Sequence, residues 1–69
     1  MDWQAIVGRN VRQLRHERGL TQEQLAFEAK LDLTYVGGIE RGRRNLSLMV
    51  LARLAGALGA GPSDLLRID

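Results

Sequence analysis

The sequence contains no cysteine, and its 69 residues include one proline, one histidine and one each of tryptophan, tyrosine and phenylalanine. Without cysteine the chain forms no disulfide, and His16 has no accompanying ligands at the spacing of a zinc site. The first residues lack the basic and apolar regions of a signal peptide, and no apolar run approaches the length of a membrane span. These absences predict a cytoplasmic protein with no metal, no other cofactor and no membrane partner.

The short length limits what can stabilise the fold. A chain of 69 residues has room for one domain, predicted to span residues 1–69, and such a domain buries only about 60% of the surface of its unfolded chain. Without disulfides or metal, oligomerisation is the remaining source of extra stability. No catalytic arrangement of side chains, glycine-rich phosphate loop or dinucleotide signature occurs, so the sequence predicts that the protein is not an enzyme.

The net charge of +2 is too small for a protein that coats nucleic acid without sequence preference. Its distribution is more informative, because Arg41, Arg43 and Arg44 fall within a short stretch while the acidic residues Glu17 and Glu23 come earlier. This cluster predicts a local basic site.

Apolar periodicity and capping residues predict helices and no strand, so the fold class is all-α. Asp2 and Gly19 bracket the first helix, Thr21 and Gln24 form a capping-box pattern, and Pro62 opens the last helix. The five predicted helices span residues 3–18, 22–29, 33–41, 47–58 and 62–67.

The two short helices at 22–29 and 33–41, joined by a tight turn, are the parts of a helix-turn-helix, although other helical hairpins share them. The residues are more specific: they are LTQEQLA at 20–26, LDLTYV at 31–36 and IERGRRN at 39–45. This pattern resembles the phage repressor and Cro-type (XRE-like) helix-turn-helix family, and within it most closely the controller proteins of restriction-modification systems. The resemblance implies a repressor-like fold, a bacterial or phage origin and binding to double-stranded DNA.

A helical wheel places Thr34, Gly37, Gly38 and Arg41 on the arc of the third helix that lies opposite its apolar residues. The resemblance implies that this arc, with the residues beside it, forms the DNA-binding face. It assigns base reading to positions on the third helix, and phosphate contacts to the start of the second helix and to the basic segment. The predicted DNA-binding residues are Gln22, Leu33, Thr34, Tyr35, Gly37, Gly38, Arg41, Arg43, Arg44 and Asn45.

The sequence departs from the controller pattern at two of these positions. Leu33 and Gly37 stand where controller proteins often carry arginine and serine, so direct base reading is expected to be thin. Each glycine costs a helix interior about 1 kcal/mol relative to alanine, and we expect Gly37 and Gly38 to allow close approach to the groove or to a partner surface. Leu33 and Tyr35 have core packing as an alternative role. A solvated charge run is the alternative for the basic cluster, but the resemblance favours phosphate contacts there, with a base contact open to Arg43 or Arg44.

Two further sets of residues are implied by the resemblance. Arg15 and Glu40 match positions that form a structural ion pair, and Leu65, Leu66 and Ile68 match a dimer interface, a role that can coexist with closure of the monomer core. The predicted function is a sequence-specific transcription regulator that binds a two-fold operator as a homodimer, with helix 33–41 in the major groove. Activation would require a further contact with RNA polymerase or another regulator. The alternative is a protein-interaction module of the same fold, such as an antiactivator or an antitoxin-like partner.

Overall fold

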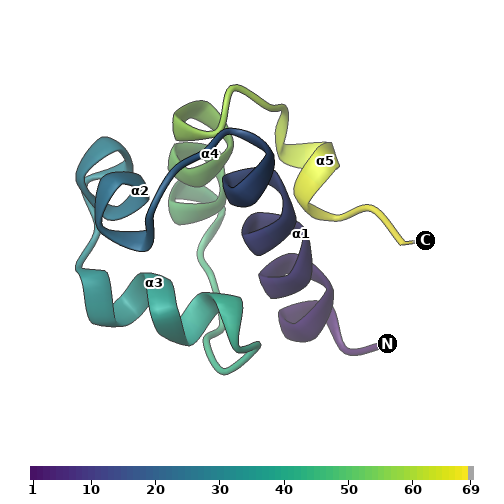
Figure 1. Ribbon diagram of the computed structural model, residues 1–69. Helices are drawn as coiled ribbons and strands as arrows, with labels where there is room; N and C mark the ends of the chain where they lie inside the picture. The colour runs from purple at the N-terminus through teal and green to yellow at the C-terminus, as the bar shows by residue number, and fades with distance from the viewer. Residues whose placement is uncertain (69) are drawn as a thin grey trace.

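The computed structural model describes residues 1–68, and within this part of the chain it contains five α-helices and no strand (Figure 1). The helices are α1 (Trp3–Glu17), α2 (Gln22–Ala29), α3 (Leu33–Glu40), α4 (Leu48–Ala57) and α5 (Pro62–Leu65). The predicted all-α, five-helix architecture is confirmed. The predicted bounds are corrected at the helix ends: α1 and α3 each end one residue earlier, α4 is one residue shorter at each end, and α5 ends two residues earlier.

Local hydrogen bonds explain where the helices begin. Asp2 accepts from the backbone N–H of Ala5 over 3.1 Å, and Ser47 caps α4 in the same way. Thr21 and Gln24 form the predicted capping box, in which each side chain accepts from the backbone N–H of the other. These caps satisfy N–H groups that have no partner inside the helix, so the helix starts are encoded locally.

The end of α3 redirects the chain across the face of the molecule. Gly42 has a φ of +73°, a left-handed conformation that favours glycine. The N–H of Arg43 donates to the carbonyl of Gly38 over 3.0 Å, which closes the helix end. The following arginines are therefore brought back alongside the helix that precedes them.

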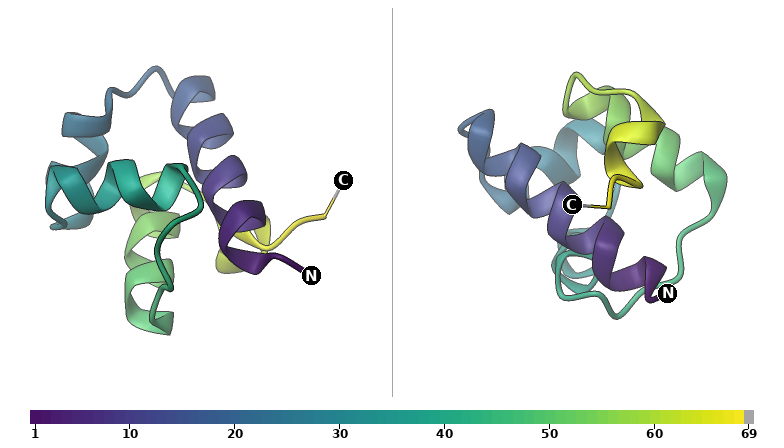
Figure 2. Two further views of the ribbon diagram at one scale, coloured as in Figure 1. Left: turned by 90° about the horizontal axis from the view of Figure 1, so that it is seen from below. Right: turned by 90° about the vertical axis from the view of Figure 1, so that its right-hand side faces the viewer.

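The helices pack around one apolar core. Helix α1 contacts α3 and α5, α2 contacts α3 and α4, and α4 contacts α5. Figure 2 shows α3 running from beside α2 to α1. The largest fully buried side chains are Val11, Leu25, Val36, Ile39, Leu54, Leu58 and Leu65. No helix in the described part of the chain is long and apolar enough to span a membrane.

Leu65 differs in burial from Leu66 and Ile68, the other residues of the predicted dimer interface. Its side chain is fully buried within one protomer, because it closes the core beside α1 and α4. The buried amide of Asn10 donates to the carbonyls of Leu65 and Arg67 over 2.8 and 2.9 Å, and so holds the C-terminal segment against α1. Leu65 therefore closes the core of the chain, while Leu66 and Ile68 are 40% and 54% exposed.

Helix α1 approaches the end of α3 through a glycine. Gly8 is buried, and a Cβ atom on it would overlap the carbonyl oxygen of Ile39 and lie 3.0 Å from that of Glu40. A glycine at this crossing lets the backbones of α1 and α3 touch. This contact sets the distance between α1 and Glu40. A glycine inside a helix is its one trace in the sequence, and that residue alone does not indicate which helix approaches it.

Candidate nucleic-acid interface

The second and third helices are joined by a tight turn and form a helix-turn-helix. Lys30 makes the turn with a φ of 58°, and Asp32 starts α3 by accepting from the N–H of Thr34 over 3.0 Å. Helix α3 lies at the edge of the molecule (Figure 1), with Val36 and Ile39 in the core. Leu33 is 42% exposed and Thr34 is also exposed, so both side chains are accessible on the outer side.

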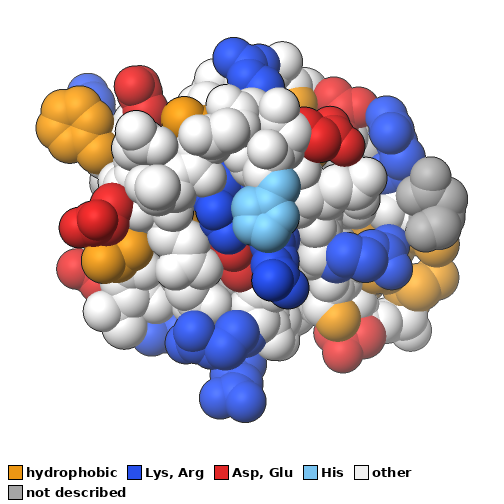
Figure 3. Space-filling view, in the orientation of Figure 1, with side chains coloured by type: hydrophobic (Ala, Val, Ile, Leu, Met, Phe, Trp, Pro, Cys, Tyr) orange, Lys and Arg blue, Asp and Glu red, His pale blue; other side chains and the backbone are white. Residues whose placement is uncertain are grey.

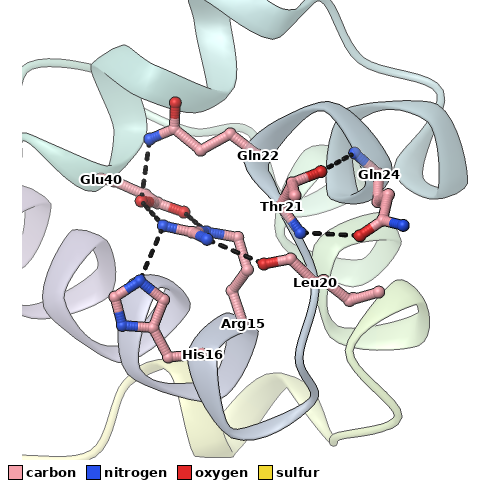
Figure 4. A network of polar contacts seen from close by, with 7 residues as sticks. All are labelled: Arg15, His16, Leu20, Thr21, Gln22, Gln24 and Glu40. Atoms are coloured by element: carbon pink, nitrogen blue, oxygen red, sulfur yellow. Dashed lines mark hydrogen bonds and ion pairs between the residues drawn. The ribbon is translucent and has the colours of Figure 1, made fainter.

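A buried ion pair ties the end of α3 to α1 and to the start of α2 (Figure 4). Arg15 Nε lies 2.6 Å from Glu40 Oε2, and the side chains of Arg15 and Glu40 are only 10% and 3% exposed. Arg15 also donates to Glu40 Oε1 over 3.0 Å and to the carbonyl of Leu20 over 2.8 Å. The structure thus places Arg15 and Glu40 in the predicted contact. It also shows that both side chains are buried, which sequence alone does not reveal.

The same carboxylate holds Gln22 in place. Gln22 Nε2 donates to Glu40 Oε1 over 3.0 Å, as Figure 4 shows. One N–H of this amide is therefore occupied, and the second N–H remains as a donor at the start of α2, beside the free backbone N–H groups of its first turn. The ion pair accordingly positions the residue that sequence analysis assigned to a phosphate contact.

Burial and hydrogen bonding act in opposite directions on Glu40. Burial alone would raise the pKa of its carboxyl, but the hydrogen bonds from Arg15 and Gln22 and the positive charges of Arg15 and Arg12 outweigh this and lower the pKa. The hydrogen bond to Glu40 raises the already high pKa of Arg15 despite partial burial. Both partners are therefore charged near neutral pH.

The outer arc of α3 differs from the expected bare glycine surface. Gly37 and Gly38 are buried, because arginine side chains from the end of the helix lie over them. A Cβ on Gly37 would lie 3.2 Å from the Nη1 atom of Arg41, and one on Gly38 would lie 3.0 Å from Nε of Arg44 and 3.1 Å from its Cγ. The glycines therefore make room for arginines of the same chain, and the expectation of an uncovered backbone is corrected.

Tyr35 supports one of these arginines. The guanidinium carbon of Arg44 lies 5.2 Å from the centre of the Tyr35 ring, within the range of a cation–π contact. The ring also packs against the core, so Tyr35 has the core-packing role that was the alternative to DNA contact. Arg41, Arg43, Arg44 and Asn45 are all exposed, and basic side chains gather at the lower edge of the molecule in Figure 3.

The arrangement has the chemistry of an anion-binding surface. In the described residues no group of three or more histidine, cysteine, aspartate or glutamate side chains is placed to hold a metal ion. His16, exposed on α1, has its Nε2 atom 3.2 Å from Arg15, a distance at which a neutral ring accepts a hydrogen bond. The donors that suit an anion are the guanidinium groups of the exposed arginines at and after the end of α3 and the amide of Gln22, whereas Glu23 and Glu28 are exposed farther along α2.

Comparison with known proteins agrees with this geometry. Residues 6–68 match the model of the helix-turn-helix domain family, so the chain belongs to that family. The control protein C.BamHI of Bacillus amyloliquefaciens is 47% identical over 62 residues, which are 88% of this chain and 76% of that protein. The control protein C.SmaI of Serratia marcescens is 44% identical, covering 96% of this chain and 79% of that protein.

The structural comparison leads to the same group. The crystal structure of the restriction-modification controller protein C.AhdI from Aeromonas hydrophila has 48% sequence identity and a TM-score of 0.87, covering 90% of this chain and 94% of that one. Within the helix-turn-helix family, the chain is therefore similar to restriction-modification controller proteins over nearly its whole length.

Proposed function

We propose that this chain is a transcription regulator that binds a two-fold DNA operator as a homodimer, with α3 of each protomer in the major groove. The observation that carries the proposal is the surface of α3, where Arg41 and Arg44 lie over Gly37 and Gly38. Guanidinium groups along an exposed helix edge suit both phosphate oxygens and the O6 and N7 atoms of guanine.

In this proposal, Arg44 supplies the bidentate base contact that no side chain of α3 provides. The Gly38 position leaves space for its side chain and the Tyr35 ring supports its guanidinium, so fewer of its rotamers are accessible before DNA is bound. A donor that is already ordered loses less conformational entropy on binding. Thr34 and Leu33 add a base-edge hydrogen bond and contact with a thymine methyl group.

Phosphate contacts fix the position of the protein on DNA. Gln22 offers an amide N–H at the start of α2, where the helix dipole also favours an anion, and Glu40 orients it. Arg41, Arg43 and Asn45 take the phosphates beside the end of α3. These contacts carry no base identity and hold α3 in register with the groove.

The dimer surface follows from the apolar side chains that one protomer leaves exposed. Leu48 and Met49 are 83% and 71% exposed, and Leu66 is 40% exposed. An apolar hollow of about 200 Å³ lies beside them, lined by Trp3, Val7, Leu51 and Leu66 among others. We place the two-fold contact here and extend it to Ile68, which is 54% exposed two residues after Leu66, because pairing removes this apolar surface from water and compensates for a small core.

Selection from a pool of random duplexes tests the whole proposal. Wild-type protein is expected to enrich an inverted repeat with half-sites about 34 Å apart. The Ile68→Asp variant is expected to sediment as a monomer and to lose most operator affinity, because a charge at the two-fold contact opposes pairing. Phe27→Asp is the matched control, since Phe27 is 83% exposed on α2, away from the proposed contact. If no sequence is enriched, the protein-interaction module becomes the better account; a dimeric Ile68→Asp variant would exclude this interface.

A double-mutant cycle tests how Gly38 acts. Arg44→Ala is expected to weaken operator binding by about 1 to 3 kcal/mol. Gly38→Ala should displace the flexible Arg44 side chain and cause a smaller loss, while alanine raises helix stability by about 0.5 to 1 kcal/mol. In the double variant the Gly38→Ala change should have no further effect on DNA affinity. Fluorescence anisotropy at fixed salt gives the four affinities, and additive losses would show that Gly38 does not act through Arg44.

A further inference from the structure

A basic groove runs between α1 and the end of α3, outside the residues that sequence analysis selected. Arg9, Arg12 and His16 follow one another at helical spacing on one exposed face of α1. Together with Arg41 on the opposite wall they line a groove of about 480 Å³. Figure 3 shows basic side chains and the histidine gathered on the face toward the viewer.

The charge of this groove is almost entirely positive. Glu40 is the only acidic side chain in its lining, and its carboxylate is 3% exposed and paired with Arg15. Its charge is therefore largely neutralised within the protein. Gly42 at the edge adds no side chain, so the space between the arginines stays open.

The two α1 arginines also differ from others in the chain by what they bind. Arg15, Arg18 and Arg67 each donate to an acceptor of the protein itself. In the described residues, Arg9 and Arg12 make neither a side-chain hydrogen bond nor an ion pair, which leaves their guanidinium donors available for an external acceptor. Such donors in a hollow favour an anion with several oxygens, and a phosphate diester satisfies two of them at once.

We propose that this groove binds the DNA backbone beside the helix-turn-helix, with Arg9 and Arg12 as phosphate contacts. The inference rests on the proposed function and extends its footprint. Arg41 belongs to both surfaces, and the Glu40 carboxylate that forms part of the groove also orients Gln22. The groove therefore continues the proposed interface along α1, and a DNA duplex is the occupant that matches its charge.

Salt titration of binding to a short random-sequence duplex tests this assignment, because phosphate contacts do not depend on sequence. The slope of log affinity against log salt is expected to fall by about 1 in Arg9→Ala and in Arg12→Ala. Arg12→Lys should retain the wild-type slope. Arg53→Ala is the matched control, since Arg53 is exposed on α4 beside a different hollow and loses the same charge.

The outcomes separate this inference from the proposed function. If wild type binds with a steep salt dependence and the Arg9 and Arg12 variants keep its slope, the groove is not a phosphate site and the proposed function stands. If Arg53→Ala lowers the slope equally, the effect is one of overall charge and the groove assignment is overturned. If wild type does not bind this duplex, the groove assignment is overturned, and the operator selection decides the proposed function separately. Circular dichroism verifies that each variant is folded. We expect all of them to fold, because Arg9, Arg12 and Arg53 are exposed.

Discussion

Replacing Glu40 with alanine is expected to lower the free energy of unfolding by about 3 to 5 kcal/mol, because a buried guanidinium is left without its carboxylate. Arg15 would keep only its bond to the carbonyl of Leu20 and its contact with His16. Domains of this kind have a total stability of about 5 to 15 kcal/mol, and a small one lies near the lower end. Urea denaturation followed by circular dichroism should therefore show a variant that is partly unfolded in the absence of denaturant.

Acid titration provides a second measure of the same contact. Since the pKa of Glu40 is lowered in the folded protein, its contribution to stability is fully present above the pKa of an unfolded glutamate, about 4.3. That contribution is lost as the pH falls through the lower pKa of the folded state. Glu40→Gln preserves the size of the side chain and removes the titrating group, so its stability should decline less in acid. If the free energy of unfolding falls equally with pH in wild type and in Glu40→Gln, ionised Glu40 is not the group that stabilises the fold.

Gly8→Ala is expected to destabilise the protein, although alanine has the higher helix propensity. The added Cβ would overlap the carbonyl oxygen of Ile39, and backbone cannot move aside as a flexible side chain can. Overpacking of this kind costs about 1 to 3 kcal/mol and occasionally more, which exceeds the gain of about 1 kcal/mol from placing alanine in a helix. Separation of α1 from α3 would also strain the Arg15–Glu40 pair, so thermal unfolding should begin at a much lower temperature.

Gly56→Ala is the matched control for that change. Gly56 also lies inside a helix, and a Cβ there would meet nothing within 4 Å. Alanine at this position should raise the free energy of unfolding by about 0.5 to 1 kcal/mol through helix propensity alone. The two substitutions are chemically identical and are expected to have opposite signs. Equal effects in the same direction would show that backbone contact at Gly8 does not determine its role.

Much of the candidate site was predictable because its signals are local or belong to a known pattern. Thr21 with Gln24 indicated the start of α2, and Asp32 indicated the start of α3, since caps depend on residues two or three positions apart. The Arg15–Glu40 contact came from family resemblance, because no local signal links residues that distant in sequence. The sequence alone does not indicate Arg9 and Arg12 as DNA-binding residues, since two exposed arginines on an amphipathic helix have no distinguishing local feature.

The sequence by itself determined the helices, their order and the presence of a basic segment after α3, because these depend on apolar spacing, caps and composition within short stretches. Only the tertiary structure decided that Leu65 belongs to the core, that Gly8 allows α1 to touch α3, and that arginines cover Gly37 and Gly38. Each of these depends on how distant segments cross, and a helix crossing is set by the packing of all its side chains together.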